Sequence, residues 1–167
     1  LPFPSSAAVH PLQPPAGPRY DGGLCFAKTV QPVLDRYCIG CHGLDRTDGG
    51  LDLLGLVEPV TFPRQQWPGP NKMLVSRAYA ALVSREGLVR VAQGDMESDY
   101  SVPKDYFAHA GRLARMLLAG HPDKDGKPLV QLDRESFRRI AEWLDVNAVC
   151  YGDYLWNKPE WRESSPD

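Results

Sequence analysis

The segment Cys38-Ile39-Gly40-Cys41-His42 constrains this chain more than any other feature of its sequence. The spacing CxxCH is typical of the covalent attachment of a c-type haem. Two thiols three positions apart on a helical turn can each add to one haem vinyl group, while the adjacent imidazole binds the iron from the proximal side. The motif therefore predicts one covalent haem c, attached through Cys38 and Cys41, with His42 as an iron ligand.

A zinc site and a thioredoxin-like dithiol are the two alternatives for these cysteines. A structural zinc site needs four ligands, and the sequence contains no second CxxC pair and no HxxxH pair. A thioredoxin-like pair follows a strand and begins a helix, whereas the run before these cysteines has helical spacing and Gly43 comes soon after them. Haem attachment is the better interpretation.

The composition fits one domain with a hydrophobic core and excludes some classes of function. Of 167 residues, 43% are hydrophobic and 24% are charged, and the formal net charge is -2. This balance argues against a nucleic-acid partner or an anionic membrane surface, and no apolar run approaches the roughly 20 residues of a membrane span. The chain starts at Leu1 without a leader, so we interpret it as a mature chain or a fragment of a larger protein.

Periodicity predicts a mainly α fold, a small c-type cytochrome-like helical haem domain. The 15 Gly and 16 Pro residues add long Pro/Gly-rich loops. Helical patterns cover residues 26–37, with a kink at Pro32 or a start near Gln31, and also 72–84, 108–119 and 134–149, the last with Asp133 as N-cap. A short strand is possible only over 88–91.

The proline content divides the chain into three parts. Residues 1–24 are a proline-rich, extended lead-in or linker. Residues 25–156 form the monohaem cytochrome c domain, and residues 157–167 form a polar C-terminal tail.

The ligand on the distal side of the iron decides between electron transfer and chemistry at the metal. Six residues are candidates: His10, His109, His121, Met73, Met96 and Met116. His121 is favoured because Gly120 ends the preceding helix and Pro122 prevents its continuation, which leaves the imidazole on a rigid corner. Met116 has the spacing of a core residue, and an open distal position remains an alternative.

Two further cysteines, Cys25 and Cys150, lie outside the haem motif. Haem c is attached in an oxidising compartment, where spare cysteines commonly pair. We therefore predict a Cys25–Cys150 disulfide, with two separate buried thiols as the alternative.

Two stretches resemble one family of haem proteins. The segment from Phe26 to Gly43, FAKTVQPVLDRYCIGCHG, resembles the haem-attachment segment of cytochrome c domains in large secreted proteins of planctomycete-type bacteria. Residues 117–121 (LLAGH), 132–147 and 151–154 are similar to the corresponding part of hydrazine synthase alpha subunits and their uncharacterised relatives. The resemblance covers roughly residues 26–154, most of the chain.

The resemblance implies a bis-histidine haem, with His42 proximal and His121 distal. It does not imply hydrazine-forming catalysis. The family's catalytic haem belongs to a different CxxCH, with a tyrosine ligand four residues after the motif histidine, and Arg46 occupies that position here. Cys25 and Cys150 do not belong to the shared motif.

These observations predict a periplasmic or secreted bacterial protein that transfers single electrons, and they favour a carrier over an enzyme. Its partners would be redox proteins or neighbouring domains of a larger polypeptide, without nucleic acid and without membrane insertion. A haem enzyme or gas-binding domain with an open distal site is one alternative, and a structural haem module is the other. Four aromatic residues could pack either on the macrocycle or in the core: Trp67, Tyr79, Trp143 and Tyr151. Arg46 and Lys72 are candidate partners of the haem propionates.

Overall fold

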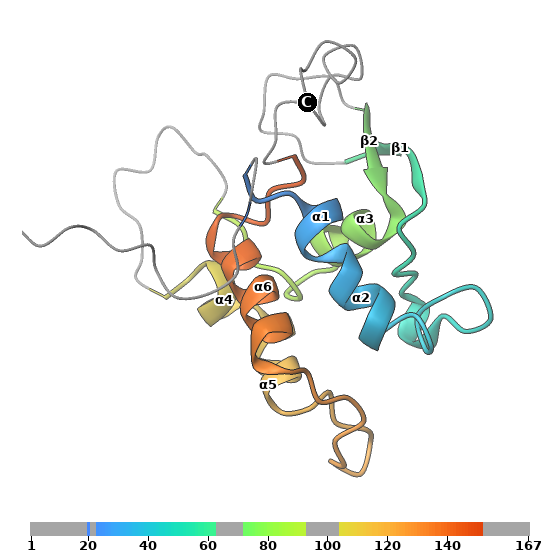
Figure 1. Ribbon diagram of the computed structural model, residues 1–167, viewed down its shortest axis with the longest axis vertical. Coiled ribbons are helices and arrows are strands. Elements are labelled where there is room, and N and C mark those ends of the chain that lie inside the picture. Colours follow the sequence, from blue (N-terminus) through green and yellow to red (C-terminus); the bar gives the residue numbers. More distant parts are fainter. Residues whose placement is uncertain (1–19, 21–22, 63–71, 93–103, 152–167) are drawn as a thin grey trace, which may run out of the picture.

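The computed structural model describes residues 20, 23–62, 72–92 and 104–151 (Figure 1). Over this part of the chain the structure is 41% helical and 12% strand, with short helices and a two-stranded antiparallel sheet. The architecture is mixed α/β, so the prediction of a mainly α, cytochrome-like fold is wrong. Within the described ranges, no helix is both long enough and apolar enough to cross a membrane.

The first predicted helix is divided in two. Helix α1 covers Phe26–Thr29 and α2 covers Gln31–Tyr37. Pro32 lies in the first turn of α2, where its missing N–H removes no helical hydrogen bond. The expected helix start near Gln31 is confirmed. Val30 between the two helices keeps right-handed helical dihedral angles, and its side chain is fully buried.

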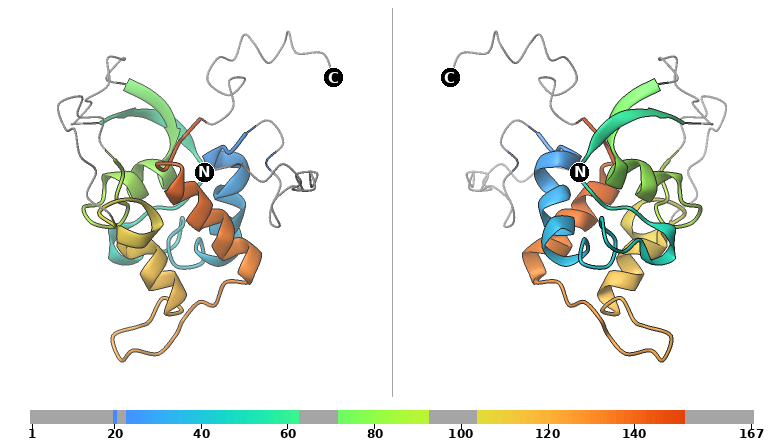
Figure 2. Two further views of the ribbon diagram at one scale, coloured as in Figure 1. Left: turned by 90° about the vertical axis from the view of Figure 1, so that its left-hand side faces the viewer. Right: turned by 90° about the vertical axis from the view of Figure 1, so that its right-hand side faces the viewer.

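The sheet replaces the first part of the helix predicted over 72–84. Strand β1 (Val57–Thr61) pairs with β2 (Lys72–Ser76), with Val57 opposite Ser76 and Pro59 opposite Leu74. The run Met73 to Val75 has the apolar content of either a helix or a strand, and its pairing with β1 decides for the strand. Figure 2 shows the two strands as a curved ribbon at one end of the molecule, with the helices below it.

Helix α3 (Arg77–Ser84) begins directly after β2. The hydroxyl of Ser76 accepts a hydrogen bond from the N–H of Tyr79, so Ser76 caps the helix. The short three-residue helix η1 (Asp48–Gly50) lies in the loop after the cysteine motif.

The helix predicted over 108–119 is also divided, into α4 (Phe107–Ala110) and α5 (Arg112–Leu118). Gly111 separates them in an extended conformation, and a Cβ atom there would lie 2.9 Å from the carbonyl oxygen of Leu88. The chain at Leu88 is buried against this glycine and is not a strand, so the possible strand over 88–91 does not form.

Helix α6 (Arg134–Asp145) confirms Asp133 as its N-cap, since the Asp133 carboxylate accepts from the N–H of Ser136. It ends four residues before the predicted residue 149. Asn147 adopts a left-handed φ of 66°, and the N–H of Ala148 bonds to the carbonyl of Trp143, which closes the helix with a Schellman turn. Asparagine tolerates this conformation better than most residues.

The core lies where α1, α2, α3, α5 and α6 meet, and an aromatic cluster occupies one end of it. Trp143 is fully buried and packs against Phe26 and Tyr79, with ring centroids 5.2 and 6.4 Å away. Its indole N–H donates to the carbonyl of Val149, and the Tyr79 hydroxyl donates to the carbonyl of Ala148. Burial, followed by the neighbouring Cys150 and Tyr151, raises the pKa of Tyr79 above its ordinary value.

The proposed boundaries of the domain fall largely outside the described residues. Only residues 20, 23 and 24 of the predicted lead-in 1–24 are described, and the tail 157–167 is not. Tyr20 donates a short hydrogen bond to the carboxylate of Glu142 on α6, so this residue of the lead-in packs on the domain.

Candidate functional site

The structure brings His42 and His121 together from the two halves of the chain. Their ring centroids are 5.9 Å apart, and the ring planes are inclined by 50°. Both side chains are half-buried, and in each the Nδ1 atom is buried without a hydrogen-bond partner. Buried polar atoms are almost always satisfied, so an unpartnered Nδ1 in each of two neighbouring rings is compatible with a further group at this place.

The separation of the two rings suits two imidazoles bound to one metal. Nitrogen–metal bonds of about 2 Å on opposite sides of an ion place the ring centres roughly 6 Å apart. Rotation of a ring about its own metal–nitrogen bond changes the interplanar angle but not this distance. The observed centroid distance of 5.9 Å meets this condition.

The cysteine motif forms one additional turn at the C-terminal end of α2. Cys38 is the C-cap residue, and its N–H donates to the carbonyl of Leu34. The carbonyl of Cys38 in turn accepts from the N–H groups of Cys41 and His42, at 3.1 and 2.9 Å. Both thiols and the imidazole therefore come from a single turn, as attachment to one ring requires. Cys41 is exposed and Cys38 is half-buried.

The loop after His42 holds this turn in place. The carbonyl of His42 accepts from the N–H of Leu53 at 2.8 Å, and the carbonyl of Cys41 accepts from the N–H of Asp48 at 3.0 Å. Gly43 is buried, and a Cβ atom at this position would lie 2.4 Å from the carbonyl oxygen of Ile39. A side chain cannot be accommodated there, so glycine directly after the motif is a structural requirement.

Gln31 is a supporting residue that the sequence analysis missed. Its buried side-chain amide donates to the carbonyl of Leu53 at 3.0 Å and to the carboxylate of Asp35 at 2.9 Å. Because the N–H of Leu53 bonds to the carbonyl of His42, Gln31 ties the start of α2 to the loop that positions His42. A glutamine on a helix carries no motif, and only the return of residues 51–55 onto α2 reveals its function.

His121 is presented by the Schellman turn that ends α5. The N–H of Gly120 bonds to the carbonyl of Leu117 at 3.0 Å, and the N–H of His121 bonds to the carbonyl of Met116 at 2.8 Å. Gly120 has φ +76°, and a Cβ atom there would lie 2.7 Å from that of Pro128. This confirms the predicted end of the helix at Gly120.

His121 itself has a φ of 47°, a left-handed conformation that is unfavourable for a residue with a side chain. Such strain persists only where the surrounding structure enforces it, and it is concentrated at functional sites. Here the enforcing contacts come from the following loop, in which Pro122 bridges to Pro128 and the N–H of Leu129 bonds to the carbonyl of Gly120. These contacts fix the backbone from which the imidazole of His121 projects.

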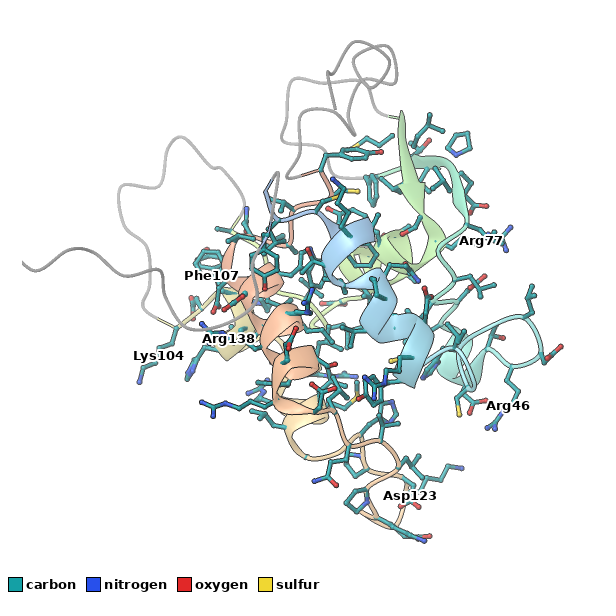
Figure 3. All side chains as sticks on the ribbon, in the orientation of Figure 1. Arg46, Arg77, Lys104, Phe107, Asp123 and Arg138 are labelled. Atoms are coloured by element: carbon teal, nitrogen blue, oxygen red, sulfur yellow. The ribbon has the colours of Figure 1, made fainter. Side chains whose placement is uncertain are left out.

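Figure 3 labels one residue on each of the two histidine-bearing loops, Arg46 and Asp123. The Asp123 carboxylate accepts from the N–H groups of Asp125 and Lys127, both at 2.9 Å, which stabilises the turn of the distal loop. Arg46 forms an exposed ion pair with Asp48. Its guanidinium already has a carboxylate partner, which weakens the prediction that it binds a propionate. The Lys72 side chain lies outside the described residues.

The other candidate ligands are placed differently or are not described. Met116 packs against the hydrophobic core, and His109 is exposed in α4. Met73 lies half-buried in β2. His10 and Met96 lie outside the described residues. Of the candidates that the structure describes, His121 is the one whose ring faces that of His42.

The alternatives to haem gain no support from the site. Burial, with the neighbouring Cys41 and Asp35, raises the pKa of Cys38 to about 11, whereas a reactive dithiol has a lowered thiol pKa. A helix also precedes the pair, not a strand. Within the part of the chain that the structure describes, no three or more His, Cys, Asp or Glu side chains are grouped so as to hold a metal ion. A zinc site lacks its donor set there, while axial haem ligation requires only two.

Exposed leucines flank both histidines. Leu44, two residues after His42, is 82% exposed, and Leu118, three residues before His121, is 70% exposed. Leu129, bonded through its N–H to the distal corner, is 59% exposed. The sequence analysis did not single out these leucines, because an apolar residue in a loop becomes informative only when its exposure is known.

The predicted aromatic neighbours of the macrocycle have other positions. Tyr79 and Trp143 belong to the core cluster, and Tyr151 is half-buried at the end of the described chain. Trp67 lies outside the described residues. The residues available to hold a haem are the cysteine turn and the two imidazoles, with exposed leucines close to them in the sequence.

Comparison with models of protein families, with curated proteins and with solved structures gives no match. The resemblance to the bis-histidine haem domains is thus a prediction from the motifs alone, and the functional argument depends on the geometry of the site.

Proposed function

We propose that this chain binds one haem c covalently and carries single electrons as a bis-histidine cytochrome in the periplasm or outside the cell. The observation that carries the proposal is the meeting of His42 and His121, each with a buried, unsatisfied ring nitrogen, beside a CxxC turn. Cys38 and Cys41 would form the two thioether bonds, and the two imidazoles would be the axial ligands.

Each part of the site has a defined task in this proposal. The α2 extension holds Cys38, Cys41 and His42 on one turn, and the Leu53 N–H restrains the proximal histidine. The Schellman corner holds His121 opposite it. A haem supplies one-electron redox chemistry when bound, and two imidazole ligands keep its iron low-spin in both oxidation states. Electron transfer then requires little movement of either ring.

The enzyme and gas-binding alternatives require an accessible sixth position. The proximity of His121 favours our proposal over them, because its imidazole, with its ring centroid 5.9 Å from that of His42, would be available as a second iron ligand. A purely structural haem module requires no rapid exchange of electrons. On our proposal, the redox partners of this chain are small redox proteins or neighbouring domains of a larger polypeptide.

The test compares the ferric absorption and electron paramagnetic resonance spectra of three proteins matured with haem: wild type, His121→Ala and His109→Ala. We expect a low-spin bis-imidazole signal in the wild type, a high-spin signal in His121→Ala, and no change in His109→Ala, since His109 is exposed in α4. A high-spin wild type, or a spectrum unaffected by His121→Ala, would contradict the ligand pair and favour chemistry at the iron. Slow or irreversible reduction of a low-spin wild type by a small periplasmic cytochrome would favour the structural module.

A further inference from the structure

The two cysteines outside the haem motif, Cys25 and Cys150, meet at the start of α1, whereas the haem motif lies at the end of α2. Cys25 is the N-cap residue of α1 and is 1% exposed. Its thiol donates to the carbonyl of Cys150 at 3.6 Å, and the same carbonyl accepts from the N–H of Phe26 at 3.2 Å. These residues are separated by 125 positions in the sequence, so their contact is a product of the fold.

The Schellman turn after α6 brings Cys150 to this position. Asn147 and Ala148 reverse the chain, and the indole N–H of Trp143 holds the carbonyl of Val149. Both cysteines are free thiols in this structure. Burial, with the adjacent Cys25, raises the pKa of the Cys150 thiol to about 12.

The haem-motif cysteines are far from this pair. Cys25 caps the start of α1 and Cys38 caps the end of α2, with residues 26–37 between them in helical conformation. At a rise of 1.5 Å per residue, their Cα atoms are roughly 15–20 Å apart. A disulfide requires Cα atoms within about 7 Å, so Cys25 cannot pair with Cys38 in the folded chain.

We propose that the fold sorts its four cysteines into two pairs with different fates: Cys25 and Cys150 oxidise to a disulfide, while Cys38 and Cys41 remain available for haem. In the oxidation, the two thiols lose two protons and two electrons to a disulfide-containing acceptor, such as an oxidoreductase of the thiol–disulfide exchange class or oxidised glutathione. The acceptor's disulfide becomes two thiols, and one S–S bond forms between Cys25 and Cys150. The disulfide does not depend on the proposed electron-transfer function, whereas the fate of Cys38 and Cys41 rests on the proposed haem attachment.

The separation matters because CxxC pairs can themselves oxidise. A chain that must keep Cys38 and Cys41 reduced for thioether formation, yet folds among oxidants, benefits when its other thiols are occupied by each other. The bond would also tie the start of α1 to the chain leaving α6, across the aromatic cluster of Phe26, Tyr79 and Trp143.

Trypsin separates the pairs cleanly, which makes the proposal testable on the full chain. Cleavage after Lys and Arg leaves Cys25 on peptide 20–28, Cys38 with Cys41 on peptide 37–46, and Cys150 on peptide 140–162. The reduced protein is refolded with oxidised glutathione, alkylated, digested without reduction and analysed by mass spectrometry. We expect peptides 20–28 and 140–162 to be cross-linked, and peptide 37–46 never to be linked to either of them.

Cross-linking of peptide 37–46 to either of the other two would overturn the sorting, and so would full alkylation of both 20–28 and 140–162.

A second measurement gives the effect of the disulfide on thermal stability. The Cys25→Ser, Cys150→Ser double variant should lose about 10 °C or more in Tm relative to the oxidised wild type, because a long loop is no longer closed. An equal Tm would contradict a disulfide in the wild type. Because the haem motif is unchanged in this variant, the loss of haem from it would count against the separation of the two sites.

Discussion

Helices α5 and α6 each end in a Schellman turn, but the residues of the two turns differ in whether their polar groups have hydrogen-bond partners. At the end of α5, Gly120 and His121 take left-handed conformations, and the imidazole that follows has a buried nitrogen without a partner. At the end of α6, Asn147 and Ala148 take the same conformations, and there the tryptophan, tyrosine and cysteine groups all find hydrogen-bond partners.

The contrast separates an end whose polar groups are satisfied within the chain from an end with an unpartnered buried nitrogen, where we propose that haem binds. The α6 end is satisfied by the chain itself, with aromatic rings in contact and polar groups bonded. The α5 end is rigid but incomplete, because the buried Nδ1 of His121 has no partner and Leu118 nearby is exposed. Because the backbone strain is common to both ends, the unsatisfied buried nitrogen is the feature that favours a ligand at the α5 end.

The largest expected effect is at the α6 end. Trp143→Ala removes a fully buried indole that packs on Phe26 and Tyr79, so the free energy of unfolding should fall by about 3–5 kcal/mol. Urea denaturation followed by circular dichroism measures it. Val146→Ala, at an exposed position next to the same turn, is the control and should change stability by less than about 0.5 kcal/mol. A loss as small as that of the control would show that this cluster is not the stabilising centre.

An intermediate effect is expected within the cysteine motif. Gly43→Ala places a methyl group 2.4 Å from the Ile39 carbonyl, and the strain should cost about 1–3 kcal/mol of stability and lower the yield of haem attachment. Gly40→Ala is the matched control, because a Cβ atom there meets nothing within 4 Å. Thermal unfolding and the haem content of the two variants, measured side by side, sharpen the comparison. If both variants behave alike, the turn does not constrain the site.

The smallest effect is expected at Asp133, which links the start of α6 to Tyr37 at the end of α2. Hydrogen bonds from the N–H of Ser136, the Tyr37 hydroxyl and the Ser136 hydroxyl hold the pKa of this exposed carboxyl well below its ordinary value. Its contribution to stability is therefore complete above about pH 4 and is lost as the pH falls further through the lowered pKa. Asp133→Asn should flatten this acid limb in a series of Tm measurements from pH 5 to 2. The same slope in both proteins would refute the assignment.

The sequence predicted correctly those helix starts and ends that depend on a single residue and its neighbours. Asp133 begins a helix, Pro32 requires the helix start at Gln31, and Gly120 ends α5, each for a reason contained in a few neighbouring residues. The position of His121 followed from the same glycine. These predictions needed no knowledge of distant contacts.

The parts that failed depend on contacts between distant segments. Residues 72–76 became a strand because β1 lies beside them, and Gly111 interrupts a helix because Leu88 approaches it. Helix α6 ends early because Asn147 takes a left-handed conformation, which the apolar periodicity of 134–149 did not predict. The hydrogen bond from Gln31 to Leu53 was not predicted either, because it joins segments that are distant in the sequence.

The central claim is that this chain carries a haem on Cys38 and Cys41, and mass spectrometry of the denatured protein tests it most directly. The full chain is produced with c-type haem maturation machinery, beside a Cys38→Ala, Cys41→Ala variant and the Cys25→Ser, Cys150→Ser variant. We predict that wild type and the second variant retain one haem after denaturation, located on peptide 37–46, and that the first retains none. Unmodified Cys38 and Cys41 in the wild type would contradict the account.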